Sequence, residues 1–186
     1  MTYHPIVVLP PDVQVLDLTR GPMAGGGDWT IGRYDEVRGE VYTQPLFAGG
    51  RCVHMGIDIG APAGVAVHAF DDGRIVAAGI NPAAGDYGPT LVAEHVLDGR
   101  PIWLLLGHLA TRSLERSPVG RSFARGEVLA WVGEKHENGG WKPHVHVQLS
   151  WEKPATHDLP GAVTLADRET SRARFPDPRL ILGPLY

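Results

Sequence analysis

The stretch KPHVHVQLS, residues 142–150, decides how this chain is interpreted. Successive side chains of an extended strand point to opposite faces, so His144 and His146 share one face. The opposite face then holds Val145, Val147 and Leu149, which suits a hydrophobic core. Two imidazoles on one face are costly to bury unless a ligand or hydrogen bonds compensate them. Alone, the pattern fits a solvated polar face about as well as a functional site.

Composition indicates an ordinary globular chain. It has 186 residues, 43% of them hydrophobic and 20% charged, which is enough for one domain with a proper core. The net charge of −4 gives no basic surface of the kind that binds nucleic acid. No apolar run is long enough to span a membrane. We therefore expect neither nucleic acid nor a membrane as a partner, and the sequence leaves the oligomeric state open.

The N-terminal sequence and the cysteine content favour a cytoplasmic location. The opening residues, MTYHPIVVLPPDVQVLDLTR, lack a basic region, and prolines interrupt their apolar stretch. We therefore expect no signal peptide and, if Met1 is the true start, a cytoplasmic location. The single cysteine, Cys52, excludes a disulfide framework and a cysteine-type zinc site. We interpret it as a buried structural thiol rather than a metal ligand.

Many short strands are predicted. The chain has 24 glycines and 16 prolines, with short β-branched runs between turn signals. Their spacing is typical of a sandwich or barrel. LDGR (97–100) predicts a hairpin turn. Strands are expected within residues 39–44, 64–70, 73–79, 89–96, 101–109, 126–133 and 144–150.

The distribution of predicted strands divides the chain into three regions. Residues 1–37 are expected to form an N-terminal extension packed on the core, and residues 38–151 the main domain. Residues 152–186 are expected to form a C-terminal extension. Within it, TLADRETSRARF (164–175) predicts a surface helix, and PDPRLILG (176–183) is expected to hold the chain end in place.

A second motif, HMGIDIGAPAG, lies at residues 54–64. Its even spacing places His54 and Asp58 on one face if the segment is extended. Gly56 and the β-branched isoleucines argue against a helix here, and Gly56 leaves room for another group to approach the backbone. Together with His146, this motif offers two imidazoles and one carboxylate.

That set is a sound first shell for Zn²⁺ with one position left for water, which favours a catalytic site over a structural one. Other divalent ions suit the same ligands. His144 is not needed as a ligand and would lie within reach of the bound water. His108, in LLLGHLA, is weak evidence alone but follows the predicted hairpin and could face the same cleft.

The order HxxxD, GHL and PHxHxQL resembles the lysostaphin and LytM type of zinc metallopeptidases, peptidase family twenty-three. The resemblance runs from His54 to Leu149 and includes HMGIDIGAPAGVAVHAFDDGRIVAAG, DYGPT (86–90) and GEVLAWVG (126–133). It implies an all-β duplicated hybrid motif, a barrel-sandwich hybrid of antiparallel strands. DYGPTLVAEH and HENGGW are similar to a subset of the family embedded in cytosolic fusion proteins, so a cytosolic variant is expected.

The resemblance also implies roles. His54, Asp58 and His146 would hold one zinc ion per chain, and His108 and His144 would be the catalytic histidines. Zinc lowers the pKa of its water toward ~7, so hydroxide is available at neutral pH. One histidine would accept the proton, and the pair would stabilise the tetrahedral intermediate. His144 is favoured as the base, but the choice stays open. The expected activity is endopeptidase-like hydrolysis of a peptide (amide) bond.

The chain departs from the family pattern in two places. The loop EKHENGGWKP (134–143) replaces a Ser/Thr/Gly-rich loop, which puts the substrate preference in doubt. Leu106 stands where the family often has a tyrosine, so one transition-state hydrogen bond is in question. Residues predicted to line the substrate groove are Tyr87, His136, Asn138 and Trp141.

Two alternatives remain. Family members that have lost ligands act as peptide-binding or regulatory modules, but every ligand and both catalytic histidines are present here. Cupins also carry HxH on a β-barrel. However, the nearest downstream glutamate, Glu152, lies too far from the motif, and HxxxD precedes it, which is the wrong order for a cupin.

Overall fold

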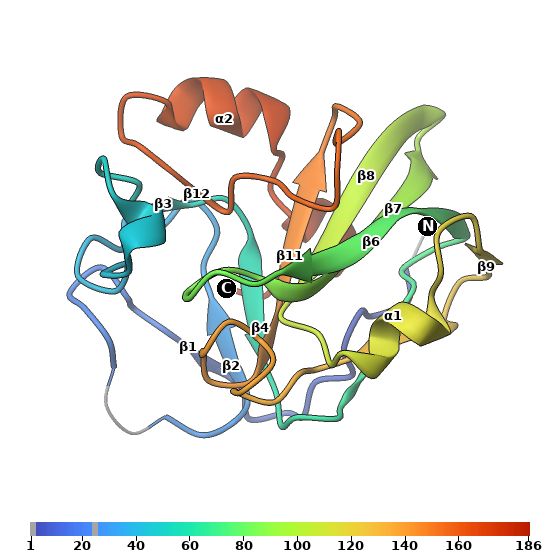
Figure 1. The fold of residues 1–186 in the computed structure, drawn as a ribbon, viewed down its shortest axis with the longest axis horizontal. Helices are drawn as coiled ribbons and strands as arrows, with labels where there is room; N and C mark the ends of the chain where they lie inside the picture. The colour runs from blue at the N-terminus through green and yellow to red at the C-terminus, as the bar shows by residue number, and fades with distance from the viewer. Residues whose placement is uncertain (1–2, 24–25) are drawn as a thin grey trace.

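The computed structural model describes residues 3–23 and 26–186. Residues 1–2 and 24–25, which belong to the expected N-terminal extension and its glycine-rich loop, lie outside the described residues. The fold is mostly β-sheet, with short helices at its periphery (Figure 1). The helical elements are η1 (Pro45–Phe47), α1 (Arg112–Arg116), α2 (Arg168–Arg174) and α3 (Arg179–Leu182).

One sheet of eight strands dominates the molecule, in the order β1-β2-β4-β11-β8-β7-β6-β9. Its strands, in that order, are Gln14–Val15, Thr30–Gly32, Ile57–Gly60, His144–Ser150, Arg100–Gly107, Gly88–Leu97, Gly73–Asn81 and Ser122–Phe123. Two smaller sheets pair β5 (Ala66–His68) with β10 (Val128–Trp131) and β3 (Val53–His54) with β12 (Ala162–Val163). The predicted all-β, antiparallel class is confirmed, although β1 pairs with β2 in parallel and the large sheet is open, ending at β1 and β9.

Six of the seven predicted strand segments contain a strand, and the hairpin at 97–100 is confirmed. Asp98 and Gly99 both have positive φ, 50° and 79°, as a type I′ turn between two strands requires. The strand predicted at residues 39–44 is wrong. The Arg38 carbonyl accepts the N–H groups of both Val41 and Tyr42, so the chain turns there and leads into η1 instead of joining a sheet.

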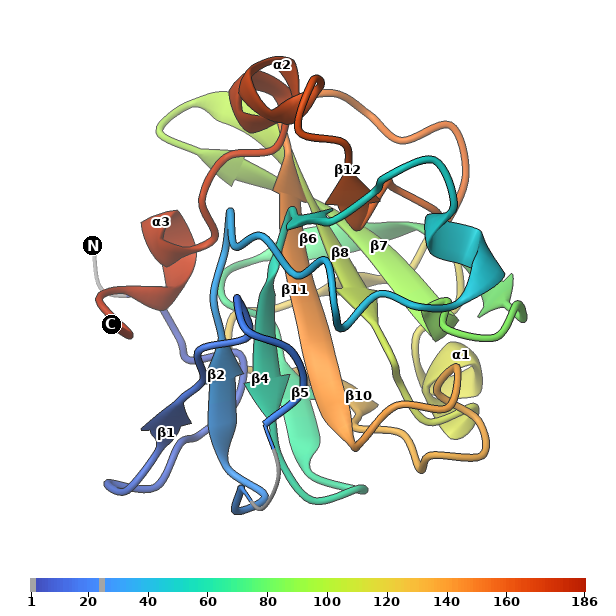
Figure 2. The same ribbon diagram turned by 90° about the vertical axis from the view of Figure 1, so that its left-hand side faces the viewer.

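The strand that holds the HxH motif, β11, lies in the middle of the large sheet, between β4 and β8 (Figure 2). Its predicted apolar face, Val145, Val147 and Leu149, is fully buried in the main hydrophobic core. A second apolar cluster, which includes Met55, Tyr87 and Phe175, lies apart from the main core. His144 and His146 alternate with the core residues along β11, so they share the other face of the sheet.

The N-terminal extension supplies two strands of the main sheet, β1 and β2, and the C-terminal extension packs against the core. In the N-terminal one, Ile31 of β2 pairs with Ile59 of β4. In the C-terminal one, the helix predicted within 164–175 is confirmed as α2, and α3 buries Ile181. The division of the chain into three regions stays a prediction. Among the residues that the structure describes, none of the helices has both the length and the apolar character needed to cross a membrane.

Candidate metal centre and its cleft

The register of β11 brings the predicted site residues together. His146 lies opposite Asp58 on β4 and opposite Gly107 on β8, which directly precedes His108. His54 lies on the short strand β3, immediately upstream of β4. Residues far apart in sequence therefore meet because three strands are hydrogen-bonded side by side.

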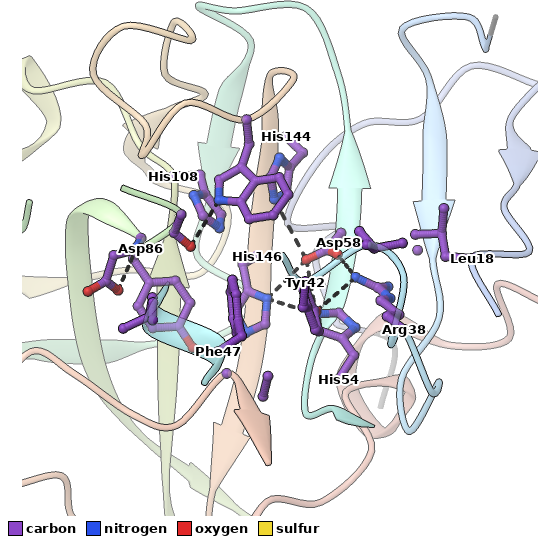
Figure 3. A pocket seen from close by; sticks show the side chains of 18 of the residues that line it. Leu18, Arg38, Tyr42, Phe47, His54, Asp58, Asp86, His108, His144 and His146 are labelled. Carbon is purple, nitrogen blue, oxygen red and sulfur yellow. Dashed lines mark hydrogen bonds and ion pairs between the residues drawn. The ribbon is translucent and has the colours of Figure 1, made fainter. Parts of the chain in front are cut away.

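The ligand-type atoms of three residues converge on one point (Figure 3). Nε2 of His54 lies 3.1 Å from Nδ1 of His146 and 3.2 Å from Oδ1 of Asp58. Nδ1 of His146 lies 2.9 Å from the same Asp58 oxygen. Ligand atoms at the corners of a zinc tetrahedron with bonds of ~2.0–2.1 Å are about 3.3 Å apart. The triangle therefore has the size that a zinc ion requires.

Hydrogen bonds on the outer side of each ring select the tautomer. Nδ1 of His54 donates to the carbonyl of Arg33 at 2.8 Å, and Nε2 of His146 donates to Oε1 of Gln148 at 3.0 Å. A neutral imidazole carries only one N–H, so the remaining nitrogen of each ring is a lone-pair acceptor. Outer hydrogen bonds of this kind are typical of metal-binding histidines.

Two imidazole lone pairs and a carboxylate oxygen thus face one another. Three acceptors at about 3 Å repel one another unless a cation or a proton lies between them, and the set of two imidazoles and one carboxylate is a catalytic-type zinc shell with a fourth position open. Within the described residues, this is the group of His, Cys, Asp and Glu side chains that fits a metal ion. Cys52 is half-buried and does not belong to it.

Gly56 makes room for the His146 ring. A Cβ at this position would lie 2.6 Å from Nε2 of His146 and 2.8 Å from the backbone oxygen of Val147. Such distances are far below van der Waals contact, so only glycine allows β4 and β11 to hold the ring where it is. The expectation that Gly56 lets another group approach the backbone is confirmed.

Asp58 is held from behind by a buried arginine. Nη1 of Arg38 donates to Oδ2 of Asp58 at 2.6 Å, leaving Oδ1 toward the imidazoles. Nε of Arg38 donates to Glu36 at 2.9 Å, and both side chains are only 3% exposed. Glu36 also accepts the backbone N–H of Leu18 at 3.1 Å. The N-terminal extension is thereby connected to the carboxylate of the site.

The two other predicted histidines, His108 and His144, lie beside the three candidate ligands His54, Asp58 and His146, here called the triad. Nδ1 of His108 donates to the Asn138 carbonyl at 2.8 Å, and Nδ1 of His144 donates to the Lys142 carbonyl at 2.7 Å. Their ring centroids are 4.2 Å apart, and Nε2 of His144 lies 3.8 Å from Oδ1 of Asp58. His108 has φ of 61°, a conformation that L residues other than glycine seldom adopt and that clusters at functional sites.

Burial keeps three of the imidazoles, those of His54, His108 and His144, neutral. Desolvation, followed by the charge of Arg38, lowers the pKa of His54 to about 4. Desolvation is also the main cause that lowers the pKa of His108 and His144. Desolvation alone would raise the pKa of Asp58, but its polar neighbours, among them the Arg38 guanidinium that donates to Oδ2, hold that pKa well below its usual range. Neutral imidazoles beside an ionised carboxylate are the forms that bind a metal cation.

A cleft of about 370 Å³ opens over these residues. Tyr87 and Trp141 line it, and their role in a substrate groove stays a prediction. The Tyr87 hydroxyl is buried and lies 3.2 Å from Oε1 of Gln148 and 3.1 Å from the Leu159 carbonyl oxygen. Asn138 is fully buried and organises its own loop through bonds to Gly133, Gly140 and Trp141. His136 is exposed and does not line the cleft. Neither Asn138 nor His136 is placed to touch a substrate with its side chain.

The profile of peptidase family M23 matches residues 52–157. This chain belongs to peptidase family M23. Membership assigns it to a family of metallopeptidases that are generally zinc-dependent. It also excludes the cupin interpretation. No curated protein matches the chain.

Several solved peptidase structures resemble the chain. The catalytic domain of the antimicrobial peptidase lysostaphin from Staphylococcus simulans is 20% identical with a TM-score of 0.49, covering 77% of this chain and 92% of its own. A mutant catalytic domain of the prophage-encoded M23 protein EnpA from Enterococcus faecalis is 22% identical with a TM-score of 0.48, covering 75% and 91%. A zinc-containing peptidase from Vibrio cholerae is 26% identical with a TM-score of 0.43, covering 57% of this chain and 29% of its own. The match thus spans less than a third of that last protein.

Sequence reasoning missed the residues that support the triad, namely Arg38, Glu36, Gln148 and Tyr42. A signal was present for two of them. Glu36 and Arg38 are an acid and a base two residues apart in DEVRG, which places them on one side of an extended segment. Nothing local indicated that this pair would be buried behind Asp58.

Replacing Gly56 should disturb the metal centre without removing a ligand. We expect Gly56→Ala to displace the His146 ring and weaken zinc affinity about 10–100-fold, the usual effect of disturbing the support of a ligand. Titration against a competing chelator measures this. Gly39→Ala is the matched control, because no atom lies within 4 Å of a Cβ at Gly39. Equal affinity of the Gly56 variant and the wild type would contradict the steric argument.

Replacing Arg38 should destabilise the metal-free protein. Arg38→Met leaves Asp58 without its cation and leaves Glu36 paired only with the partly exposed Arg33. We therefore expect the free energy of unfolding to fall by about 3–5 kcal/mol in urea with chelator present. Arg172→Met removes a half-exposed arginine from surface ion pairs and should change the free energy of unfolding by less than about 1 kcal/mol. A change of less than about 1 kcal/mol for Arg38→Met would show that the Glu36–Arg38–Asp58 ion pairs do not stabilise the fold.

Proposed function

We propose that this protein is a zinc-dependent hydrolase that cleaves a peptide (amide) bond in an endopeptidase-like manner. His54, Asp58 and His146 would hold one zinc ion per chain. The observation that carries the proposal is the meeting of two imidazole lone pairs and a carboxylate oxygen at distances of 2.9–3.2 Å, with outer hydrogen bonds already fixing both rings. Family membership supports it.

A bound zinc ion would supply Lewis acidity, lowering the pKa of a water toward ~7 and polarising the substrate carbonyl. His144 is proposed as the general base. Its Nδ1–H is held by the Lys142 carbonyl, which leaves the Nε2 lone pair on the side of Asp58. Burial keeps this imidazole neutral and able to accept the proton of the attacking water.

His108 is proposed as the partner of His144. Its Nδ1–H is held by the Asn138 carbonyl, and its ring lies 4.2 Å from that of His144, so a proton taken up by one imidazole stays close to the other. The resulting imidazolium can stabilise the developing negative charge and then donate its proton to the leaving amine. Fixed orientation of both rings removes the entropy of bringing the groups together.

A second candidate is a catalytically silent peptide-binding or regulatory module on the same fold. It is favoured by Leu106, which occupies the position of the family's tyrosine and is fully buried in the main core, so it brings no hydroxyl to the cleft. Either function implies a peptide as the partner. The cytoplasmic location expected from the N-terminal sequence stays a prediction.

Two single variants separate a ligand from a base. His146→Ala should lose bound zinc, because one of three ligands is removed. His144→Ala should retain about one zinc per chain and lose peptide hydrolysis by about 10²–10⁴-fold, the usual contribution of a general acid–base group. Elemental analysis and cleavage of blocked glycine-containing peptides provide the two readouts.

His157→Ala is the control, because its side chain lies outside the cleft lining. It should retain both zinc and activity. Equal zinc content in the His146 and His144 variants would refute the assignment of ligands. Full zinc content with no hydrolysis by the wild type, together with peptide binding that survives His144→Ala, would favour the silent module.

A further inference from the structure

We infer that the cleft selects peptides with a large apolar side chain, aromatic or leucine-like, next to the scissile bond. This inference rests on the proposed peptidase function and concerns its substrate class. The feature that carries it is a group of three half-buried aromatic residues, Tyr42, Phe47 and Trp141, here called the aromatic wall. All three line the same cleft as the candidate metal ligands.

The aromatic wall is continuous. The rings of Tyr42 and Phe47 stack with centroids 4.3 Å apart and an interplanar angle of 17°. Trp141 meets both edge-on, at 6.4 Å from each. Figure 3 shows Tyr42 and Phe47 among the side chains that line the cleft with the candidate metal ligands. Aromatic rings in such contact form a broad apolar surface, and half-buried rings still offer part of that surface to a ligand.

The aromatic wall is tied to the metal ligand by one guanidinium group. Nη1 of Arg38 donates to the Tyr42 hydroxyl at 3.2 Å and to Oδ2 of Asp58 at 2.6 Å. This link through the buried Arg38 side chain sets the position of the Tyr42 ring relative to Asp58. The surface it creates therefore lies beside the scissile bond, not at a distant subsite.

Hydrogen bonds also fix the position of Trp141 in the aromatic wall. Nε1 of Trp141 donates to the Gly85 carbonyl at 3.1 Å, and its backbone N–H donates to the side chain of Asn138 at 3.0 Å. The preceding glycines, Gly139 and Gly140, have positive φ and allow the loop to turn back over the cleft. The aromatic wall is thus formed before substrate arrives, which reduces the entropy lost on binding.

The remaining lining adds apolar surface and no dominant charge. Apart from the Arg38–Asp58 pair, the charged residues of the cleft are two acids, Asp86 and Asp158, and two bases, Arg51 and Lys142. Such a balance gives little preference for a charged substrate. Apolar side chains that line the cleft are Leu16, Leu18, Val41, Leu46 and Leu159.

These observations predict discrimination in favour of apolar side chains. A cleft of about 370 Å³ is at the small end of ligand sites and suits a short peptide segment. Burying a leucine or phenylalanine side chain against apolar walls is worth on the order of 10–100-fold in binding, whereas glycine has no side chain to bury. A peptide made only of glycine would leave the aromatic wall uncovered.

The test uses the full chain loaded with zinc. Blocked pentaglycine is compared with the same peptide carrying one Phe, Leu, Lys or Asp at each position in turn, with kcat/KM and the cleaved bond determined by mass spectrometry. We expect the Phe and Leu peptides to be cleaved next to the apolar residue, about 10–100-fold faster than pentaglycine. Lys and Asp should give no such gain.

Single-residue variants test whether the aromatic wall causes the preference for Phe and Leu peptides. Phe47→Ala and Trp141→Ala should each bring the ratio of Phe-peptide to pentaglycine kcat/KM toward one. Val96→Ala, at an apolar residue that is 62% exposed in the β7–β8 hairpin, should leave both rates unchanged. Pentaglycine cleaved as fast as the Phe and Leu peptides would overturn the inference while the proposed function stands.

A binding measurement keeps the two proposals distinguishable. If no peptide is hydrolysed, the proposed function fails, and calorimetry of the same zinc-loaded protein decides the substrate class. Binding of the Phe peptide about tenfold or more tighter than pentaglycine, lost in Trp141→Ala, supports the aromatic wall as an apolar side-chain pocket. Equal binding of the two peptides overturns it.

Discussion

The register between β11 and its two neighbours is the constraint on which the site depends. Because His146 is paired with Asp58 on one side and with Gly107 on the other, one strand position brings together a ligand pair and the residue before His108. A shift of one residue would turn both β11 histidines into the core and Val145 and Val147 into the cleft. The burial of the apolar face of β11 therefore fixes the site as well as the fold.

Several buried polar groups beside β11 and β4 hold the candidate metal ligands in place. Arg38 holds one oxygen of Asp58, Gln148 accepts from His146, and the Arg33 carbonyl accepts from His54. Burying an arginine between two carboxylates contributes little net stability, but it fixes geometry. The same guanidinium contacts Tyr42, so the support of the metal ligand and the shape of the cleft are coupled.

The sequence predicted what depends on local periodicity and could not predict what depends on distant packing. Alternation within HVHVQLS identified both the core face and the paired histidines, and Gly56 was correctly expected to allow a close approach. The strand predicted at residues 39–44 failed because β-propensity there is overridden by a turn onto the Arg38 carbonyl. Tyr42 and Arg38 became part of the cleft only through that turn. Asn138, predicted to line the groove, is fully buried and forms hydrogen bonds within its own loop, which no local pattern could show.

X-ray absorption at the zinc edge tests the central claim most directly. The protein would be purified without chelator or nickel resin and supplied with one equivalent of Zn²⁺. The account predicts one tightly bound zinc with two imidazole nitrogens at ~2.0–2.1 Å, one carboxylate oxygen and one further light atom. Failure to take up zinc, or a spectrum with a sulfur ligand from Cys52, would contradict it.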